Sequence, residues 1–107
     1  MNVLDELDRI LGERRGAAPE DSYVAGLYAA GLNRMLEKVG EEASEVILAA
    51  KDLEAGGGAE ELVKEVADLW FHTLVVLKHL DLDHRAVLHV LEDRFGTSGL
   101  DEKRSRG

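Results

Sequence analysis

The chain of 107 residues contains no cysteine and no long uninterrupted apolar run. The lack of cysteine excludes disulfides, thiolate metal sites and cysteine nucleophiles, and it favours a reducing compartment. The longest apolar stretches are interrupted by His and Lys before they could span a bilayer. No basic region opens the N-terminus as in a signal peptide. We therefore expect a cytoplasmic protein with no membrane partner.

Basic residues are also scarce, with 13 Lys and Arg against 22 Asp and Glu and a formal charge of -9. This balance argues against a broad nucleic-acid footprint or an anionic membrane surface, so we expect no nucleic-acid partner. The sequence has no P-loop, no nucleophile elbow and no dinucleotide-binding glycine motif. Any phosphate chemistry must therefore be centred on a metal ion and a few local basic residues.

Apolar residues recur at helical spacing through most of the chain, which is short enough for a single domain over residues 1–107. Ser22 and Asp83 are well placed as N-caps, and Gly31 is expected to interrupt a helix. The expected helices cover residues 3–13, 22–28, 32–51, 59–80 and 83–95, with a linker at 14–21. Residues 95–107 are predicted to form a flexible tail or a tail that caps the site.

Three consecutive glycines, Gly56 to Gly58, lie between the two longest expected helices and predict a turn between antiparallel neighbours. In residues 69–77 apolar side chains reach nearly all round the helix, which one small domain cannot easily bury. We therefore predict an all-α fold, an antiparallel bundle of four to five helices whose core is completed by dimerisation. The expected assembly is a homodimer.

Two acidic pairs stand out on the flanks of the apolar stripes. Glu42 and Glu45 are one helical turn apart, and Glu65 and Asp68 repeat this spacing on the next helix, where Glu61 and His72 follow the same flank. If the helices pack antiparallel, the pairs face each other across one cavity. Such an oxygen-rich site suits Mg²⁺, or alternatively Mn²⁺. The alternative is that these carboxylates are simply solvated.

Other polar residues near these pairs have open roles. His72 follows Asp68 by one turn and is a candidate ligand, base or substrate-binding group, or else a packed histidine bonded to a carboxylate. Lys38 and Lys51 are candidate phosphate contacts, although basic residues beside acids often only balance charge. Trp70 is expected in the core or at an interface.

Four blocks of the sequence together resemble one enzyme family. They are Lys38–Glu45, Ala49–Asp52, Glu65–His72 and Arg94–Lys103. They are similar to the phosphoribosyl-ATP pyrophosphohydrolases, which catalyse the second step of histidine biosynthesis and belong to the all-α nucleoside triphosphate pyrophosphatase superfamily. The two acidic pairs mark the superfamily alone, whereas the surrounding blocks and the C-terminal block are specific to this family.

The resemblance implies Mg²⁺-dependent hydrolysis of the α,β-phosphoanhydride of phosphoribosyl-ATP, a small-molecule nucleotide, to phosphoribosyl-AMP and pyrophosphate. It implies that the metal ligands and catalytic carboxylates are Glu42, Glu45, Glu65 and Asp68. Glu41 or one of these ligands would take the proton of the attacking water, and Lys38, Lys51 and Lys103 would contact phosphate. Two other functions stay open: a house-cleaning nucleoside triphosphate pyrophosphatase, and a non-catalytic helical interaction module.

Overall fold

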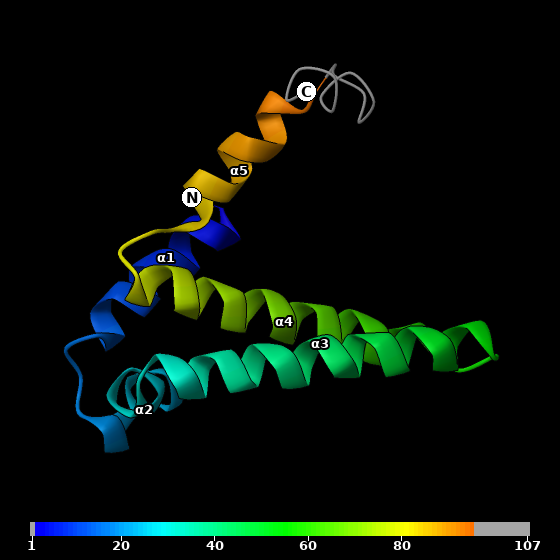
Figure 1. Cartoon of the computed structure of the whole chain (residues 1–107), viewed down its shortest axis with the longest axis horizontal. Helices are drawn as coiled ribbons and strands as arrows, with labels where there is room; N and C mark the ends of the chain where they lie inside the picture. The colour runs from blue at the N-terminus through cyan, green and yellow to red at the C-terminus, as the bar shows by residue number, and fades with distance from the viewer. Residues whose placement is uncertain (1, 96–107) are drawn as a thin grey trace.

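The computed structural model describes residues 2–95, and this part of the chain is helical with no strand. The elements are α1 (Val3–Arg14), the short 3₁₀ helix η1 (Pro19–Asp21), α2 (Tyr23–Ala30), α3 (Leu32–Glu54), α4 (Ala59–His79) and α5 (His84–Asp93). Figure 1 shows α3 and α4 as a long pair, with the other helices gathered at one end of it. The predicted all-α fold with four to five α-helices is confirmed, and dimerisation stays a prediction.

The α3–α4 hairpin depends on the glycine turn at its tip (Figure 1). The Gly56 and Gly57 amides donate to the carbonyls of Leu53 and Asp52 at 3.0 and 2.8 Å, which closes α3 with a Schellman motif. Gly56 has a φ of +105°, and a Cβ at Gly57 would lie 2.8 Å from the Asp52 carbonyl oxygen. These two positions therefore require glycine, and they make the reversal sharp enough for α3 and α4 to lie side by side.

Side-chain caps fix where three of the helices begin. Asn2 accepts a hydrogen bond from the Asp5 amide, Ser22 from the Ala25 amide, and Asp83 from the Arg85 amide. Each cap satisfies an amide that has no partner within the helix. The predicted caps Ser22 and Asp83 and the break at Gly31, which has a φ of +96°, are confirmed.

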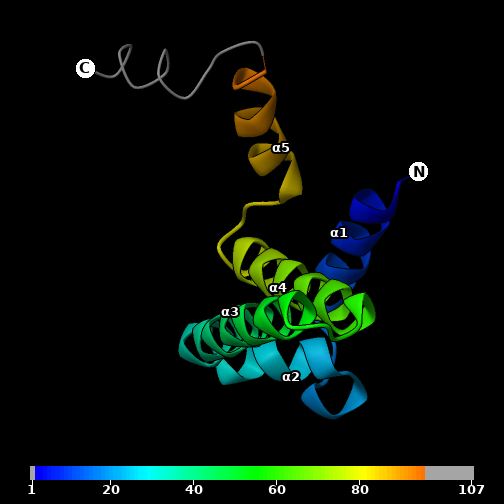
Figure 2. The ribbon, with the colours of Figure 1, turned by 90° about the vertical axis from the view of Figure 1, so that its right-hand side faces the viewer.

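The core lies at the base of the hairpin, where α1 and α2 pack against α3 and α4. Its buried residues are Leu11, Val24, Leu27, Met35 and Val75. Tyr28 joins α2 to α1 by donating its hydroxyl proton to the Leu11 carbonyl at 3.0 Å. Figure 2 shows α2 beneath the hairpin, while α1 and α5 project from its other side. The hairpin is therefore anchored at its base, and α5 stands away from the core.

Some boundaries differ from the sequence-based prediction. The helix expected to end near Lys51 continues to Glu54, because its end is set by the Schellman motif, and the last helix ends at Asp93. The expected linker contains η1, which begins at Pro19. In the described part of the chain no helix combines the length and apolarity that a membrane crossing requires. The predicted tail lies outside the described residues, apart from Phe95, and the single-domain boundaries stay a prediction.

Candidate metal centre

Three carboxylates from the two long helices converge in the hairpin. Glu42 of α3 and Glu65 and Asp68 of α4 each place one carboxylate oxygen within 4.8 Å of the others. Glu65 is buried, with only 6% of its surface exposed, and Glu42 is partly buried. The one-turn spacing of Glu65 and Asp68 puts both on the α4 face that meets α3. The antiparallel packing therefore creates an acidic group from residues more than twenty positions apart.

The geometry of this group fits a small divalent cation. Oxygen ligands of Mg²⁺ lie at about 2.1 Å, so neighbouring ligand oxygens are about 3.0 Å apart and opposite ones about 4.2 Å apart. Oxygens already within 4.8 Å of one another need only small side-chain rotations to reach these separations. Carboxylate oxygens are also the donors that Mg²⁺ and Mn²⁺ prefer. Three such ligands leave coordination positions for water and for substrate phosphate.

The pKa values of these acids are shifted by burial and by their mutual interaction. Burial raises the pKa of Glu42, as do its hydrogen bond to Glu65 and the charge of Asp68. The pKa of Glu65 is lowered, first by its hydrogen bond to Glu61 and in smaller part by Lys64 and Glu42. The opposite shifts of Glu42 and Glu65 show that a second negative charge beside Glu65 is disfavoured. A divalent cation would relieve this repulsion.

Glu45, the fourth predicted ligand, does not belong to the three-carboxylate group. It is exposed, and its charge acts instead on Glu61, helping to raise the pKa of that residue after the larger effect of the hydrogen bond to Glu65. Glu61 is thus an additional acid at the edge of the group. The sequence analysis placed Glu61 on the correct flank of α4 but did not include it in the site. Its spacing of one helical turn from Glu65 was the signal that it lies there.

Basic residues border the carboxylates on both helices. Lys38 has its ammonium nitrogen 3.0 Å from a Glu41 oxygen and 3.8 Å from a Glu42 oxygen. Lys64, which the sequence analysis did not single out, lies 3.5 Å from Glu65 and 3.8 Å from Asp68. Its spacing of four residues from Asp68 was the signal for this contact. Lys38 and Lys64 therefore flank the site from α3 and α4.

Lys51, another predicted phosphate contact, lies away from the carboxylates. Lys51 is nine residues beyond Glu42, about 14 Å along the helix axis, and its ammonium pairs with Glu54 at 3.1 Å near the hairpin tip. Lys103 lies outside the described residues. Of the two predicted lysines within residues 2–95, the structure therefore places Lys38, and not Lys51, beside the acidic group.

His72 is buried below this group and both of its ring nitrogens have protein partners. Nδ1 lies 2.8 Å from the Asp68 carbonyl oxygen, and Nε2 lies 2.8 Å from the Tyr23 hydroxyl. The residue is 6% exposed, and both ring nitrogens already have protein partners. A role of His72 in binding substrate or metal stays a prediction. His72 is a packed histidine, and its partner on α4 is a backbone carbonyl. Tyr23 comes from a helix 49 residues earlier, and no sequence signal indicated this pairing.

Glu41 lies on the exposed side of α3, next to the carboxylate group. Its pKa is lowered by the Lys38 ammonium, which donates a hydrogen bond to it, and in smaller part by Arg34. Arg34 lies 3.8 Å from it. Glu41 is therefore ionised at neutral pH and links these two cations to the edge of the site.

Comparison with known proteins identifies the family of this chain. The family model described as phosphoribosyl-ATP pyrophosphohydrolase matches residues 4–95, which include all three clustered carboxylates. A protein of Hydrogenovibrio crunogenus named phosphoribosyl-ATP pyrophosphatase is 50% identical over 105 residues, covering 98% of this chain and 93% of the relative. The chain belongs to the phosphoribosyl-ATP pyrophosphohydrolase family.

Proposed function

We propose that this chain hydrolyses phosphoribosyl-ATP to phosphoribosyl-AMP and pyrophosphate, the second step of histidine biosynthesis, with a divalent cation held by Glu42, Glu65 and Asp68. The function follows from the family and from the 50% identity to a relative named for this activity. The observation that carries the site is the convergence of three carboxylate oxygens within 4.8 Å. We take Mg²⁺ as the cation, with Mn²⁺ as its substitute, and the cytoplasm as the compartment.

The bound cation would neutralise phosphate oxygens, orient the substrate and lower the pKa of water. The chain's own residues have three tasks in this proposal. Glu42, Glu65 and Asp68 hold the cation between the long helices, and Glu65, as the buried member, fixes its depth. Lys38 and Lys64 place positive charge on either side of the carboxylates, where phosphate oxygens would lie. Glu41 keeps Lys38 in position.

A carboxylate must also accept the proton of the attacking water. Glu41 is ionised, lies beside the group and is not one of the three proposed ligands. Its side chain is 54% exposed, so it can release a proton to solvent after turnover. We therefore assign Glu41 as the general base of the proposed reaction.

The proposed function is tested by comparing pyrophosphate release from phosphoribosyl-ATP and from the ordinary nucleoside triphosphates, each with MgCl₂ and with a chelator. We expect release from phosphoribosyl-ATP that depends on Mg²⁺ and exceeds that from the other substrates by at least about 100-fold in kcat/KM. A preference for ordinary triphosphates would instead identify a house-cleaning pyrophosphatase. No release from any of them would favour a non-catalytic module.

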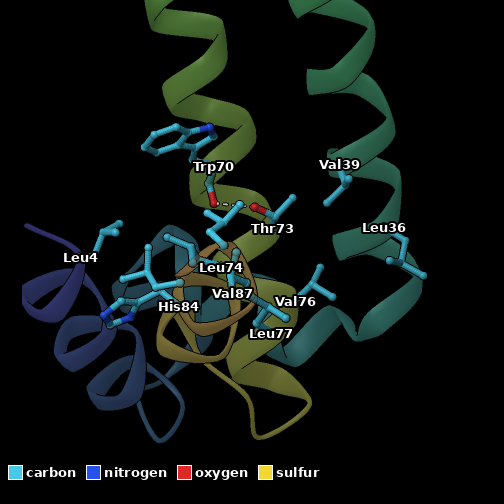
Figure 3. A pocket seen from close by; sticks show the side chains of 12 residues that line it. Leu4, Leu36, Val39, Trp70, Thr73, Leu74, Val76, Leu77, His84 and Val87 are labelled. Carbon is cyan, nitrogen blue, oxygen red and sulfur yellow. Dashed lines mark hydrogen bonds between the residues drawn. The ribbon is translucent and has the colours of Figure 1, made fainter. Parts of the chain in front are cut away.

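We also propose that the chain works as a homodimer. An open apolar groove of about 620 Å³ runs between α4 and α5 and is also bordered by α1 and α3. Figure 3 shows Trp70, Leu36 and Val87 around it, contributed by three different helices. Among the described residues that line the groove there is no Asp, Glu, Lys or Arg. In a chain of net charge -9, such a charge-free surface is typical of a homodimer interface.

The exposure of large side chains in this groove supports a second copy as its occupant. Trp70 is 60% exposed and Leu36 and Leu91 are nearly half exposed, although all three belong to well-formed helices. Since the same apolar walls would be present on both copies, a two-fold arrangement covers them mutually. This arrangement also explains why residues 69–77 are apolar nearly all round the helix. α4 would be covered by its own chain on one side and by the second copy on the other.

A further inference from the structure

Tyr23 is held beside the metal centre by contacts that the proposed reaction does not yet use. It is the first residue of α2, directly after the capping residue Ser22. Its hydroxyl lies 2.8 Å from His72 Nε2, and the two rings meet edge to face with centroids 5.8 Å apart. Despite these contacts Tyr23 is 55% exposed. The ring is thus fixed in orientation while one side of it faces open solvent.

The hydrogen-bond partners of His72 determine whether the Tyr23 hydroxyl can donate or accept a further hydrogen bond. A backbone carbonyl only accepts, so Nδ1 of His72 donates its hydrogen to Asp68 O. In the neutral imidazole Nε2 is then an acceptor, and the Tyr23 hydroxyl donates to it. The single hydroxyl hydrogen is thereby used within the protein. The phenol oxygen then has only lone pairs left, so it can accept a further hydrogen bond but cannot donate one to a phosphate oxygen.

The position of the phenol is at the edge of the carboxylate group. Its partner His72 is bonded to the backbone of Asp68, one of the proposed ligands. On the α3 side Tyr23 is an electrostatic neighbour of Lys38, whose pKa is raised mainly by Glu41 and in smaller part by the tyrosine. Lys38 in turn lies 3.8 Å from Glu42. A nucleotide whose phosphates reach the cation would therefore pass close to Tyr23.

We propose that Tyr23 accepts a hydrogen bond from the nucleoside part of the substrate. It thereby contributes to recognition of the nucleoside and not of the phosphate groups. This inference rests on the proposed function. The group that it recognises is an O–H or N–H donor, either a ribose hydroxyl or the exocyclic nitrogen of the purine. His72 is the positioning residue, because it accepts the phenol hydrogen and leaves the lone pairs of the oxygen for the substrate.

The test is a comparison of Tyr23→Phe with Tyr28→Phe. Both changes remove one hydroxyl from α2, but the Tyr28 hydroxyl donates to Leu11 O in the core contact with α1. With phosphoribosyl-ATP, Tyr23→Phe is expected to lower kcat/KM about fivefold to tenfold, mostly through KM, which corresponds to one hydrogen bond. Inorganic pyrophosphate with MgCl₂, used as a competitive inhibitor, should bind wild type and Tyr23→Phe equally well.

Two substrate analogues identify the donor: one that lacks the 2′-hydroxyl of the triphosphate-bearing ribose, and one with oxygen in place of the exocyclic nitrogen. The analogue that lacks the recognised donor should be turned over equally by wild type and Tyr23→Phe, within about twofold. The other analogue should still show the loss. Tyr28→Phe should give the same ratio to wild type with all three substrates.

Three results would overturn the assignment. Weaker pyrophosphate inhibition in Tyr23→Phe would mean that the phenol serves the phosphate site. The same loss with phosphoribosyl-ATP and both analogues, or no loss at all, would mean that the phenol oxygen recognises neither donor. If wild type itself releases no pyrophosphate from phosphoribosyl-ATP, the proposed function fails as well. An active wild type with unchanged analogue ratios in Tyr23→Phe rejects only the role of Tyr23.

Discussion

Glu42 and Glu45 are the same residue type one helical turn apart, and the fold separates their roles. Glu42 points toward Glu65 and Asp68 and is partly buried, whereas Glu45 is exposed and interacts electrostatically with Glu61. Residues three apart on a helix differ by about 60° in direction, which is enough to separate a ligand from its neighbour at a helix contact. The proposed site therefore depends on one of the two much more than on the other.

Glu42→Gln and Glu45→Gln test this difference directly. Glu42→Gln is expected to lower kcat by at least about 100-fold, since even outer partners of metal ligands contribute about 10- to 100-fold. It should also abolish the rise in melting temperature that MgCl₂ gives wild type. Glu45→Gln should keep most of that rise and lose less than about tenfold in kcat. Equal losses in the two variants would contradict the three-carboxylate site.

Lys38 and Lys51 form a second matched pair on α3. Each ammonium bonds a glutamate three residues later, Glu41 at 3.0 Å and Glu54 at 3.1 Å. Only Lys38 is also next to the carboxylate group, and its side chain is 19% exposed compared with 73% for Lys51. Removal of either lysine therefore breaks a similar local ion pair, but only one removal takes a cation away from the site.

We expect Lys38→Met to raise KM for phosphoribosyl-ATP about tenfold or more, because a charge-assisted hydrogen bond to phosphate is worth about 1.5–3 kcal/mol. Lys51→Met should change KM less than about twofold. Steady-state kinetics at saturating MgCl₂ give both values. A large effect of Lys51→Met would show that the hairpin tip approaches the substrate, contrary to the distance along α3.

At the scale of elements, the sequence predicted the helices well because their signals are local. Ser22, Gly31 and Asp83 act on amides or dihedral angles within a few residues, and the structure uses each as expected. The end of α3 was misjudged because the Schellman motif at Gly56 and Gly57 extends the helix past the last apolar residue of the stripe. A local pattern therefore fixed the elements to within a few residues.

The site was less predictable, because it depends on how α3 and α4 are aligned. The sequence named the acidic pairs, but the register that brings Glu42 rather than Glu45 to Asp68 follows from the hairpin turn and the core below it. The Tyr23–His72 contact joins residues 49 positions apart, so no local spacing pattern in the sequence predicts it. Long-range side-chain partners of this kind follow from packing and not from periodicity.

The cap of α5 gives a pH-dependent prediction at the element scale. The pKa of Asp83 is lowered, first by the Arg85 amide and in smaller part by the Arg85 charge. A lowered carboxyl pKa stabilises the fold above the unfolded-state value of about 3.9, and this stabilisation is lost as the pH falls through the folded-state value. Asp83→Ala should therefore reduce the free energy of unfolding by about 1 kcal/mol at pH 7 and by less below pH 4.

The matched control is Asp93→Ala at the other end of α5. An acidic residue at a helix C-terminus interacts unfavourably with the helix dipole, so its removal should leave stability unchanged or slightly raised. Urea unfolding at pH 7 and pH 3, at one protein concentration, measures both variants. A loss for Asp83→Ala that is equally large at both pH values would show that the cap does not act through the ionised carboxylate.

At the scale of the whole molecule, the chain divides between a small core and a broad uncovered apolar surface. The core joins α1 and α2 to the base of the hairpin. Beyond it Ile47, Leu48 and Val63 on the hairpin, and Leu88 and Leu91 on α5, are all more than one third exposed. Because α5 is attached to α1 by the His84–Asp5 contact at 2.8 Å, it is held away from the hairpin with the groove open between them.

A charge placed in the groove should therefore separate the proposed dimer while each chain stays folded. Leu88 lines the groove and is 38% exposed, whereas Ala86, two residues earlier on α5, is exposed and does not line it. Burial of an unpaired carboxylate at an interface costs several kcal/mol, so Leu88→Asp should raise the dimer dissociation constant at least about 100-fold. Ala86→Asp should leave it within about threefold. Sedimentation equilibrium gives both constants, and circular dichroism checks that the helices persist. A wild-type chain that is monomeric at micromolar concentration, or a Leu88→Asp variant as dimeric as Ala86→Asp, would show that the groove does not receive a second copy.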